Sequence, residues 1–137
     1  MLDERFTTWL RDFLTRHRAV AGSVHVVDGD QLSIRAAVNL PPKVIELTST
    51  IPLGKGMAGL AWQHDKAIQT CNLKDDTSGV VKPGAKAVEG KAAVALPVHD
   101  QSGMVRAVVG LAWMDERELP ADEITAIDVD AASLPEA

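Results

Sequence analysis

Residues 51–71 read IPLGKGMAGLAWQHDKAIQTC. This pattern predicts a short extended segment over 51–53 and a glycine corner over 54–56. A helix of small residues is expected over 57–64, because alanine and glycine permit close approach to a sheet, and a strand is expected over 67–71. The stretch therefore predicts a helix held tightly between two extended segments.

A second stretch, residues 91–113, reads KAAVALPVHDQSGMVRAVVGLAW. Its two apolar runs, over 91–99 and 104–113, are typical of buried strands. The polar residues Asp100-Gln101-Ser102-Gly103 separate the two runs and favour a turn. We therefore expect a β-hairpin near the end of the chain.

The N-terminal part predicts a helix and another hairpin. Apolar residues at helical spacing form one stripe, and the helix is expected to end near Arg18. Strands are expected over 20–27 and 31–40, on either side of Asp28-Gly29-Asp30, which favours a tight hairpin turn. The second of these strands alternates apolar residues with others, which indicates one apolar face. That face is formed by Leu32, Ile34, Ala36 and Val38.

The order of elements predicts the fold class. Pro120 opens a final helix at a position that proline favours. The chain then reads helix, hairpin, helix, strand, loop, hairpin, helix, so the sheet is mainly antiparallel. We expect one α+β domain over residues 1–137, with five or six strands and with the N- and C-terminal helices flanking the sheet.

Composition excludes several classes of protein. The formal net charge is −5, which disfavours a nucleic-acid partner. Residues 1–13 carry charges where a signal peptide is apolar, and no apolar run reaches the ~20 residues of a membrane helix, so we expect a cytoplasmic protein that does not bind membranes. The single cysteine, Cys71, excludes an internal disulfide and a multi-cysteine zinc cluster.

These stretches together resemble a GAF domain. The glycine corner is carried by 51–59, the following strand and loop by 67–70 and 72–76, and the last hairpin by 93–98 and 108–113. The resemblance covers nearly the whole chain and implies a GAF/PAS-like fold. It also implies a stand-alone regulatory module in signal transduction, which binds a small molecule or a partner protein and catalyses nothing.

The same resemblance implies where a ligand would bind. In GAF domains the variable loop, here 72–89, closes over a cavity beside the sheet. We therefore expect the pocket wall to contain loop residues, Cys71 and inward-facing residues of the strands. The predicted ligand-binding residues are Cys71, Asp75, Asp76, Thr77, His25, Ala93, Ala95 and Trp113. The Asn-Lys-Phe-Asp-Glu set of cyclic-nucleotide-binding members and a bilin-attachment cysteine context are both missing, so no cofactor is expected. No metal site is expected either, because the histidines are widely spaced.

The residues Gly54 to Gly59 satisfy G-x-G-x-x-G, with Asp75 and Asp76 about 20 residues further on, as in a dinucleotide-binding fingerprint. That fingerprint requires a buried strand before its first glycine. Thr48-Ser49-Thr50 are too polar for such a strand. These glycines are better explained by a tight turn and close helix packing.

Two other functions stay open beside the regulatory one. The first is a Cys71-dependent redox sensor or an enzyme that resembles methionine-sulfoxide reductases, which share the GAF fold. One cysteine cannot form the intramolecular disulfide of that catalytic cycle. The second is a dimeric scaffold with a closed core and no ligand.

A homodimer through the terminal helices is also implied by the resemblance. Residues 115–130 contain seven acidic residues and one arginine, whereas the first helix is basic on its polar side. Opposite charges of this kind steer docking between two copies. A signalling partner protein is expected as well, because the chain contains no recognisable effector domain.

Overall fold

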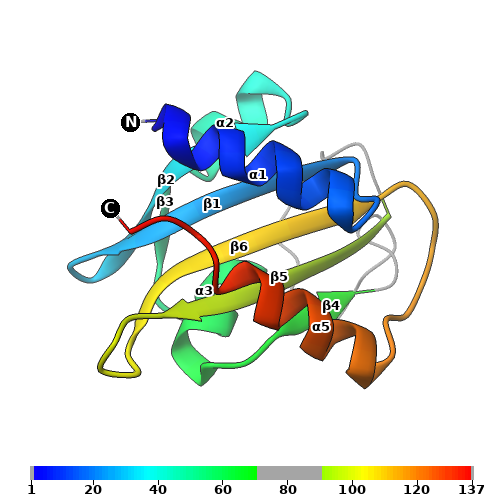
Figure 1. Ribbon diagram of the computed structural model, residues 1–137. Helices are drawn as coiled ribbons and strands as arrows, with labels where there is room; N and C mark the ends of the chain where they lie inside the picture. The colour runs from blue at the N-terminus through cyan, green and yellow to red at the C-terminus, as the bar shows by residue number, and fades with distance from the viewer. Residues whose placement is uncertain (1, 71–90, 137) are drawn as a thin grey trace.

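The described residues form one six-stranded antiparallel sheet with helices on both faces. The computed structural model describes residues 2–70 and 91–136. The strand order across the sheet is β3-β2-β1-β6-β5-β4 (Figure 1). The strands are β1 (Ala21–Asp28), β2 (Gln31–Val38), β3 (Thr50–Pro52), β4 (Ile68–Thr70), β5 (Ala92–His99) and β6 (Val105–Trp113). This architecture confirms the predicted α+β class.

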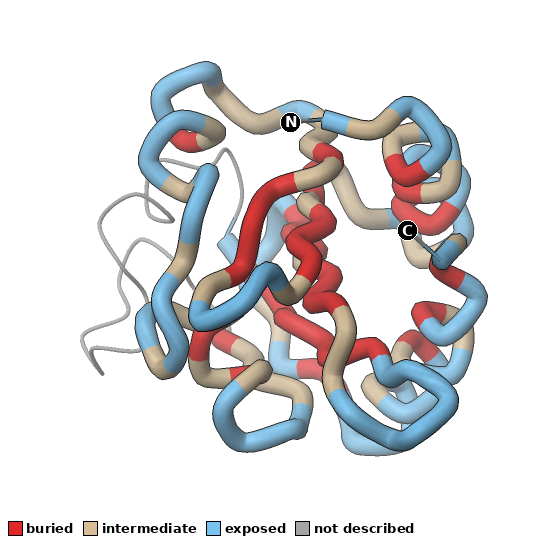
Figure 2. Tube along the Cα trace, turned by 90° about the vertical axis from the view of Figure 1, so that its left-hand side faces the viewer, coloured by how far each residue is buried: buried red, intermediate tan, exposed pale blue. Residues whose placement is uncertain are grey.

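The helices are divided between the two faces. Their bounds are α1 (Glu4–Arg16), α2 (Pro42–Leu47), α3 (Gly56–His64) and α5 (Ala121–Ala131). The terminal helices α1 and α5 cover one face, as predicted (Figure 1). In Figure 2 the buried residues run through the central sheet and along the sides of the helices that face it. Within residues 2–70 and 91–136, every helix is too short or too polar to cross a membrane.

Helix α1 packs its apolar stripe on the sheet. The buried residues of the stripe are Phe6, Leu10, Phe13 and Leu14. At the start of the helix, the Asp3 side chain accepts a hydrogen bond from the backbone N–H of Arg5 at 2.9 Å, which caps the first turn. The helix ends at Arg16, two residues before the predicted end near Arg18, and Arg18 itself has a φ of 58°, which an α-helix does not allow.

The hairpin between β1 and β2 turns where the sequence predicts it. Asp28 pairs with Gln31, and Gly29 between them has a φ of 64°, which glycine adopts without steric cost. Strand β2 ends at Val38 and not at residue 40, since Asn39 has a φ of 57° and leaves the extended conformation.

A β-bulge in β2 overturns the predicted single apolar face of that strand. Val24 pairs with Ala36, but the next residue, His25, pairs with Ile34, so Arg35 is an extra residue on β2. Paired residues in an antiparallel sheet point to the same side, and neighbours along a strand point to opposite sides. Ile34 and Ala36 therefore lie on opposite faces, although plain alternation predicts that they share one.

Candidate functional site

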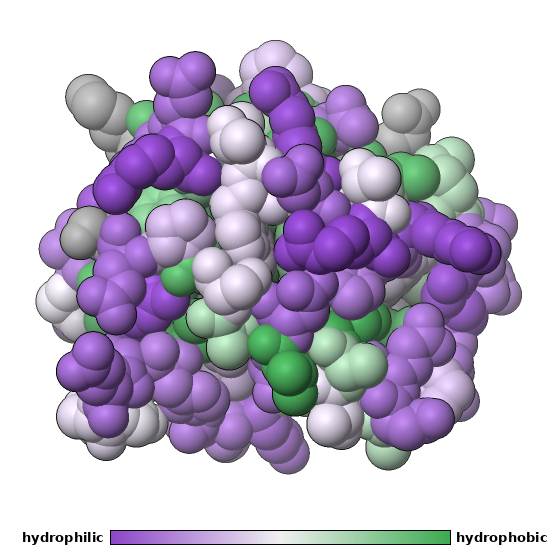
Figure 3. Space-filling model, viewed as in Figure 1, coloured by the Kyte–Doolittle hydropathy of each residue, from purple (hydrophilic) through white to green (hydrophobic). Residues whose placement is uncertain are grey.

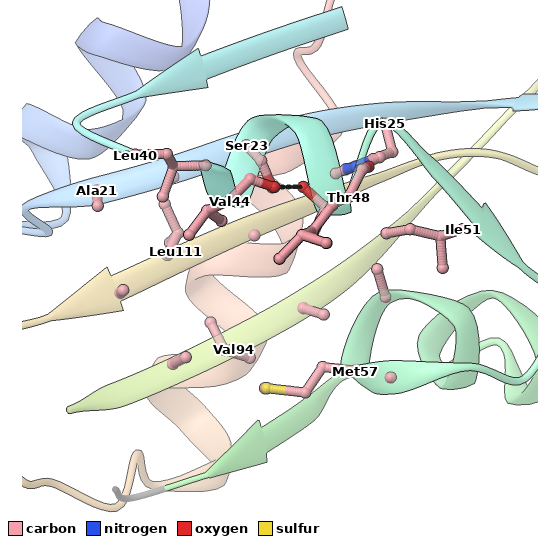
Figure 4. A pocket seen from close by; sticks show the side chains of 18 of the residues that line it. Ala21, Ser23, His25, Leu40, Val44, Thr48, Ile51, Met57, Val94 and Leu111 are labelled. Atoms are coloured by element: carbon pink, nitrogen blue, oxygen red, sulfur yellow. Dashed lines mark hydrogen bonds between the residues drawn. The ribbon is translucent and has the colours of Figure 1, made fainter. Parts of the chain in front are cut away.

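A pocket of about 570 Å³ lies between the sheet and the helices α2 and α3. Figure 4 shows side chains from both helices and from the central strands directed around this space. The described residues that line the pocket are Ala21, Gly22, Ser23, His25, Leu40, Val44, Leu47, Thr48, Thr50, Ile51, Pro52, Lys55, Gly56, Met57, Ala58, Ala93, Val94, Ala95, Gly110, Leu111 and Ala112. Most of these side chains are apolar, which is typical of a small-molecule site.

The floor of the pocket consists of small residues on three neighbouring strands. They form two rows across β1, β6 and β5, in which each residue pairs with the next. The rows are Ala21, Ala112, Ala93 and Ser23, Gly110, Ala95. A Cβ atom added to Gly110 would lie 3.1 Å from Oγ of Ser23, so this glycine leaves room beside the hydroxyl. Short side chains on three adjacent strands create the volume of the pocket.

The walls of the pocket come from α2 and α3. Val44 within α2 and Thr48 at its C-terminal end lie across the floor from Met57 in the first turn of α3 (Figure 4). Gly59 lets α3 pack closely against the segment before it, because a Cβ atom at this position would lie 2.7 Å from the carbonyl oxygen of Pro52. This glycine thus serves close packing, as the sequence indicates.

The structure excludes the dinucleotide-binding interpretation of the glycine corner. The strand before Gly54 is β3, which has three residues and lies at the edge of an antiparallel sheet. A dinucleotide fingerprint follows a central strand of a parallel sheet.

His25 is the buried polar side chain of the site. It is 3% exposed, and its Nε2 lies 2.7 Å from the carbonyl oxygen of Thr48. Because a carbonyl only accepts, Nε2 must carry the proton. Burial lowers the pKa of His25 to about 4, against the opposing effect of this hydrogen bond. The imidazole is therefore neutral near pH 7.

Only one lining residue among the described ones carries a permanent charge. This is Lys55, which is exposed and immediately precedes α3. The floor is lined by alanine and glycine with Ser23, His25 lies on the same face of β1, and Thr48 and Thr50 are the other uncharged polar residues of the lining. A charged group placed at the floor would lose its hydration without gaining a partner, so the floor favours uncharged groups.

The structure brings three of the predicted site residues together at the pocket. These are His25 on β1 and Ala93 and Ala95 on β5. The predicted residues Cys71, Asp75, Asp76 and Thr77 lie outside the described residues, as does the predicted loop closure over 72–89.

Trp113 is placed away from the pocket, contrary to the expectation from sequence. It is 1% exposed, packs in the core with α1, and its Nε1 donates to the carbonyl of His17 at 3.0 Å. The physical reason is alternation along β6: Ala112 lines the pocket, so the next residue points to the opposite face.

Sequence reasoning did not single out Ser23 or the residues of α2. Ser23 stands two residues before His25 on a strand that pairs regularly with β6, so both must share a face. That spacing is a signal in the sequence. The contribution of α2 has no comparable local signal, because it depends on how the segment from 39 to 49 folds back over the sheet.

The family model described as GAF domain matches residues 2–131. The chain belongs to the GAF domain family. This match confirms the resemblance drawn from the glycine corner and the last hairpin. No curated protein is significantly similar to this GAF domain in sequence.

Several solved structures share the fold of this GAF domain. A type II free methionine-R-sulfoxide reductase from Thermoplasma acidophilum superposes with a TM-score of 0.73 at 14% identity, covering 96% of this chain and 89% of that one. The GAF domain of an Acinetobacter phosphoenolpyruvate-protein phosphotransferase superposes with a TM-score of 0.72 at 15% identity, covering 94% of this chain and 76% of that one. A GAF domain/HD domain protein from Geobacter sulfurreducens superposes with a TM-score of 0.73 at 11% identity, covering 94% of this chain and 86% of that one. At such identities the similarity establishes the fold alone.

Proposed function

We propose that this GAF domain is a regulatory module that binds a small molecule in the pocket between the sheet and α2 and α3, without catalysing a reaction. The observation that carries the proposal is the apolar pocket of about 570 Å³. Small-molecule sites have volumes of about 300–1,000 Å³ and apolar walls with a few polar groups. The pocket fits this description, and its polar side chains are those of Ser23, His25, Thr48, Thr50 and Lys55.

The composition of the floor supports a binding role over a packing role. A sheet face that serves only stability is filled with large side chains, because an unfilled cavity in a core weakens folding. Here the floor holds four alanines, a serine and a glycine. A ligand would supply the missing contacts and stabilise the folded protein by mass action.

Binding would act on the two helices that wall the pocket. A ligand on the floor contacts α2 through Val44 and α3 through Met57, so it favours the arrangement of these helices that closes around it. A partner protein that recognises this arrangement would receive the signal. The partner is a separate chain in this proposal.

We also propose that two copies associate through the face formed by α1 and α5. Figure 3 shows this face as largely hydrophilic. Arg11 on α1 and Arg18 just after it are exposed, and so are Asp122 and Glu123 on α5. In a two-fold dimer, α1 of each copy would meet α5 of the other with opposite charge. The dimer should therefore weaken as salt concentration rises, which light scattering at increasing salt measures.

A second candidate function is reduction of free methionine sulfoxide. Structures from Thermoplasma acidophilum, Neisseria meningitidis and Staphylococcus aureus that share the fold are free methionine-R-sulfoxide reductases. This chain has one cysteine, so its resolving thiol would have to come from another molecule. The assay is thiol-dependent sulfoxide reduction by the wild type and by Cys71→Ser. Activity that requires Cys71 would favour the enzyme over the regulatory module.

The test of the regulatory function is native mass spectrometry of freshly purified protein, before and after denaturation. We expect a mass excess that disappears on denaturation. Ala95→Leu should abolish this excess, because the larger side chain fills the floor. Ala126→Leu, the same change at an exposed position of α5, should retain it.

An empty wild-type protein would not by itself end the proposal, because a weak ligand can be lost in purification. A metabolite screen by thermal shift follows in that case. No stabilising compound in the screen, or equal binding by wild type and Ala95→Leu, would contradict the proposal and favour the dimeric scaffold.

A further inference from the structure

We infer that the pocket selects an uncharged molecule with an apolar body and one hydrogen-bond donor, such as a phenol hydroxyl or an indole N–H, and that Nδ1 of His25 accepts the hydrogen bond from that donor. This inference rests on the proposed ligand-binding function and names the class of ligand. The observation that carries it is a buried imidazole at the pocket with one nitrogen already bonded.

The bonding of His25 leaves one nitrogen available. Nε2 donates to the carbonyl oxygen of Thr48 at 2.7 Å, which fixes the tautomer. In that tautomer Nδ1 has no proton and can only accept. Within the part of the chain that the structure describes, Nδ1 makes no hydrogen bond. No fully buried side-chain nitrogen or oxygen of the described residues lacks a partner, so Nδ1 is an accessible atom on a residue that lines the pocket and can accept a hydrogen bond from a ligand there.

The surroundings of His25 restrict the rest of the ligand to apolar groups. Its cross-strand neighbours are Ile34 and Val108, and the floor consists of alanine and glycine with the single hydroxyl of Ser23. Lys55 is exposed at the pocket rim. A cation or an anion at the depth of His25 would be desolvated without a counter-charge.

Ser23 adds polarity without adding selectivity. Its hydroxyl makes no hydrogen bond to a described residue and lies on the same face of β1 as His25. A hydroxyl both donates and accepts, so it tolerates donors and acceptors alike. The neutral imidazole only accepts at Nδ1, and it is therefore the group that distinguishes a ligand with a donor from one without.

The same histidine connects the ligand to a wall of the pocket. Thr48 ends α2, and its own Oγ1 donates to the carbonyl of Val44 at 2.7 Å. A donor bound at Nδ1 polarises the ring and strengthens the bond from Nε2 to Thr48. Ligands with a donor should therefore hold α2 on the sheet more firmly than ligands of equal shape without one.

The test compares two probes of nearly the same shape, indole and indene, which differ by N–H against CH₂. Both are titrated against the full chain by calorimetry, and the side-chain nitrogens of the histidines are followed by long-range ¹H–¹⁵N spectra. We expect indole to bind about 2- to 12-fold more tightly than indene, the fold-change of one net hydrogen bond. The Nδ1 resonance of His25 should move upfield with indole and stay unchanged with indene.

Two variants separate the role of His25 from general effects. His25→Phe keeps a ring and removes the acceptor, so the preference for indole should disappear. His64→Phe, the matched change at an exposed position, should leave it intact. If His25→Phe does not fold, the nitrogen spectra of the wild type decide the question alone.

The inference is overturned if both probes bind with equal affinity and leave Nδ1 unmoved, which is also the result expected if a water molecule holds that nitrogen permanently. It is likewise overturned if neither probe binds. The proposed function has a different test, because loss of the co-purifying mass in Ala95→Leu does not depend on a donor.

Discussion

Acid should weaken the fold through His25. The side chain is 3% exposed, and burial lowers its pKa from 6.5 to about 4. The unfolded chain therefore binds a proton near pH 6.5, whereas the folded protein does not until about pH 4. Because the unfolded state holds more protons within this window, the free energy of unfolding falls as pH falls through it. This loss of stability is absent above about pH 6.5 and complete below about pH 4.

The size of the effect follows from the separation of the two pKa values. Each pH unit between them weakens folding by about 1.4 kcal/mol, so the whole window costs about 3 kcal/mol. Small domains are stable by about 5–15 kcal/mol, so one buried imidazole accounts for a measurable share of the acid sensitivity.

The assay is urea unfolding of wild type and His25→Gln across this pH window. Glutamine does not titrate, and its amide can still donate to the Thr48 carbonyl. We expect wild type to lose about 3 kcal/mol more than the variant between neutral pH and pH 4. Asp128, whose pKa is raised by burial, acts in the opposite direction but is present in both proteins and cancels in the difference.

The control is His64→Gln, at an exposed position at the end of α3, which should follow wild type. If wild type and His25→Gln lose stability in parallel across the window, His25 titrates alike in the folded and unfolded states. The argument for a buried neutral imidazole would then be wrong.

Three further changes test the packing around the site. Gly22→Ala places a methyl group 2.6 Å from a carbonyl oxygen of β6, so we expect a loss of about 1–3 kcal/mol in urea unfolding; a variant as stable as wild type would show that the strand pair accommodates the methyl group. Gln69→Leu removes both hydrogen bonds to the backbone of Leu119, which is 4% exposed, and should cost about 1–3 kcal/mol; an unchanged unfolding midpoint would contradict this. Asp130→Asn loses the ion pairs with the basic end of α1, which are partly exposed, so we expect at most about 1 kcal/mol, and less in high salt.

Much of the fold could be predicted because its turns and its first helix carry local signals. Asp28 and Gly29 favour a tight hairpin turn, and the apolar stripe of α1 has helical spacing. The bulge at Arg35 is different, since the extra residue is an ordinary strand residue and nothing in the alternation marks it. Its position depends on how β1 pairs with β2, which is a tertiary property.

The candidate site was harder to predict because helices cover both faces of the sheet. Strand β5 is buried at seven of its eight positions, so hydrophobicity does not separate the pocket face from the core face. Trp113 illustrates the difficulty. It is apolar and follows a pocket residue, Ala112, and only the placement of α1 assigns its ring to the core.

Side-chain size carries the distinction that hydrophobicity lacks. Along β5, Ala95 lines the pocket while its neighbour Leu96 belongs to the core beneath α1 and α5, and along β6 Gly110 and Val109 divide in the same way. The large residues on the face covered by α1 and α5 supply hydrophobic stabilisation. Replacing a large side chain by a small one in a core lowers the free energy of unfolding by about 2–5 kcal/mol. The small residues on the pocket face therefore contribute less to stability than large ones would, and a ligand bound there would raise the free energy of unfolding. His25 stands on that face and bonds the end of α2 through the Thr48 carbonyl, so a ligand in the proposed site would be coupled to this wall of the pocket through one side chain.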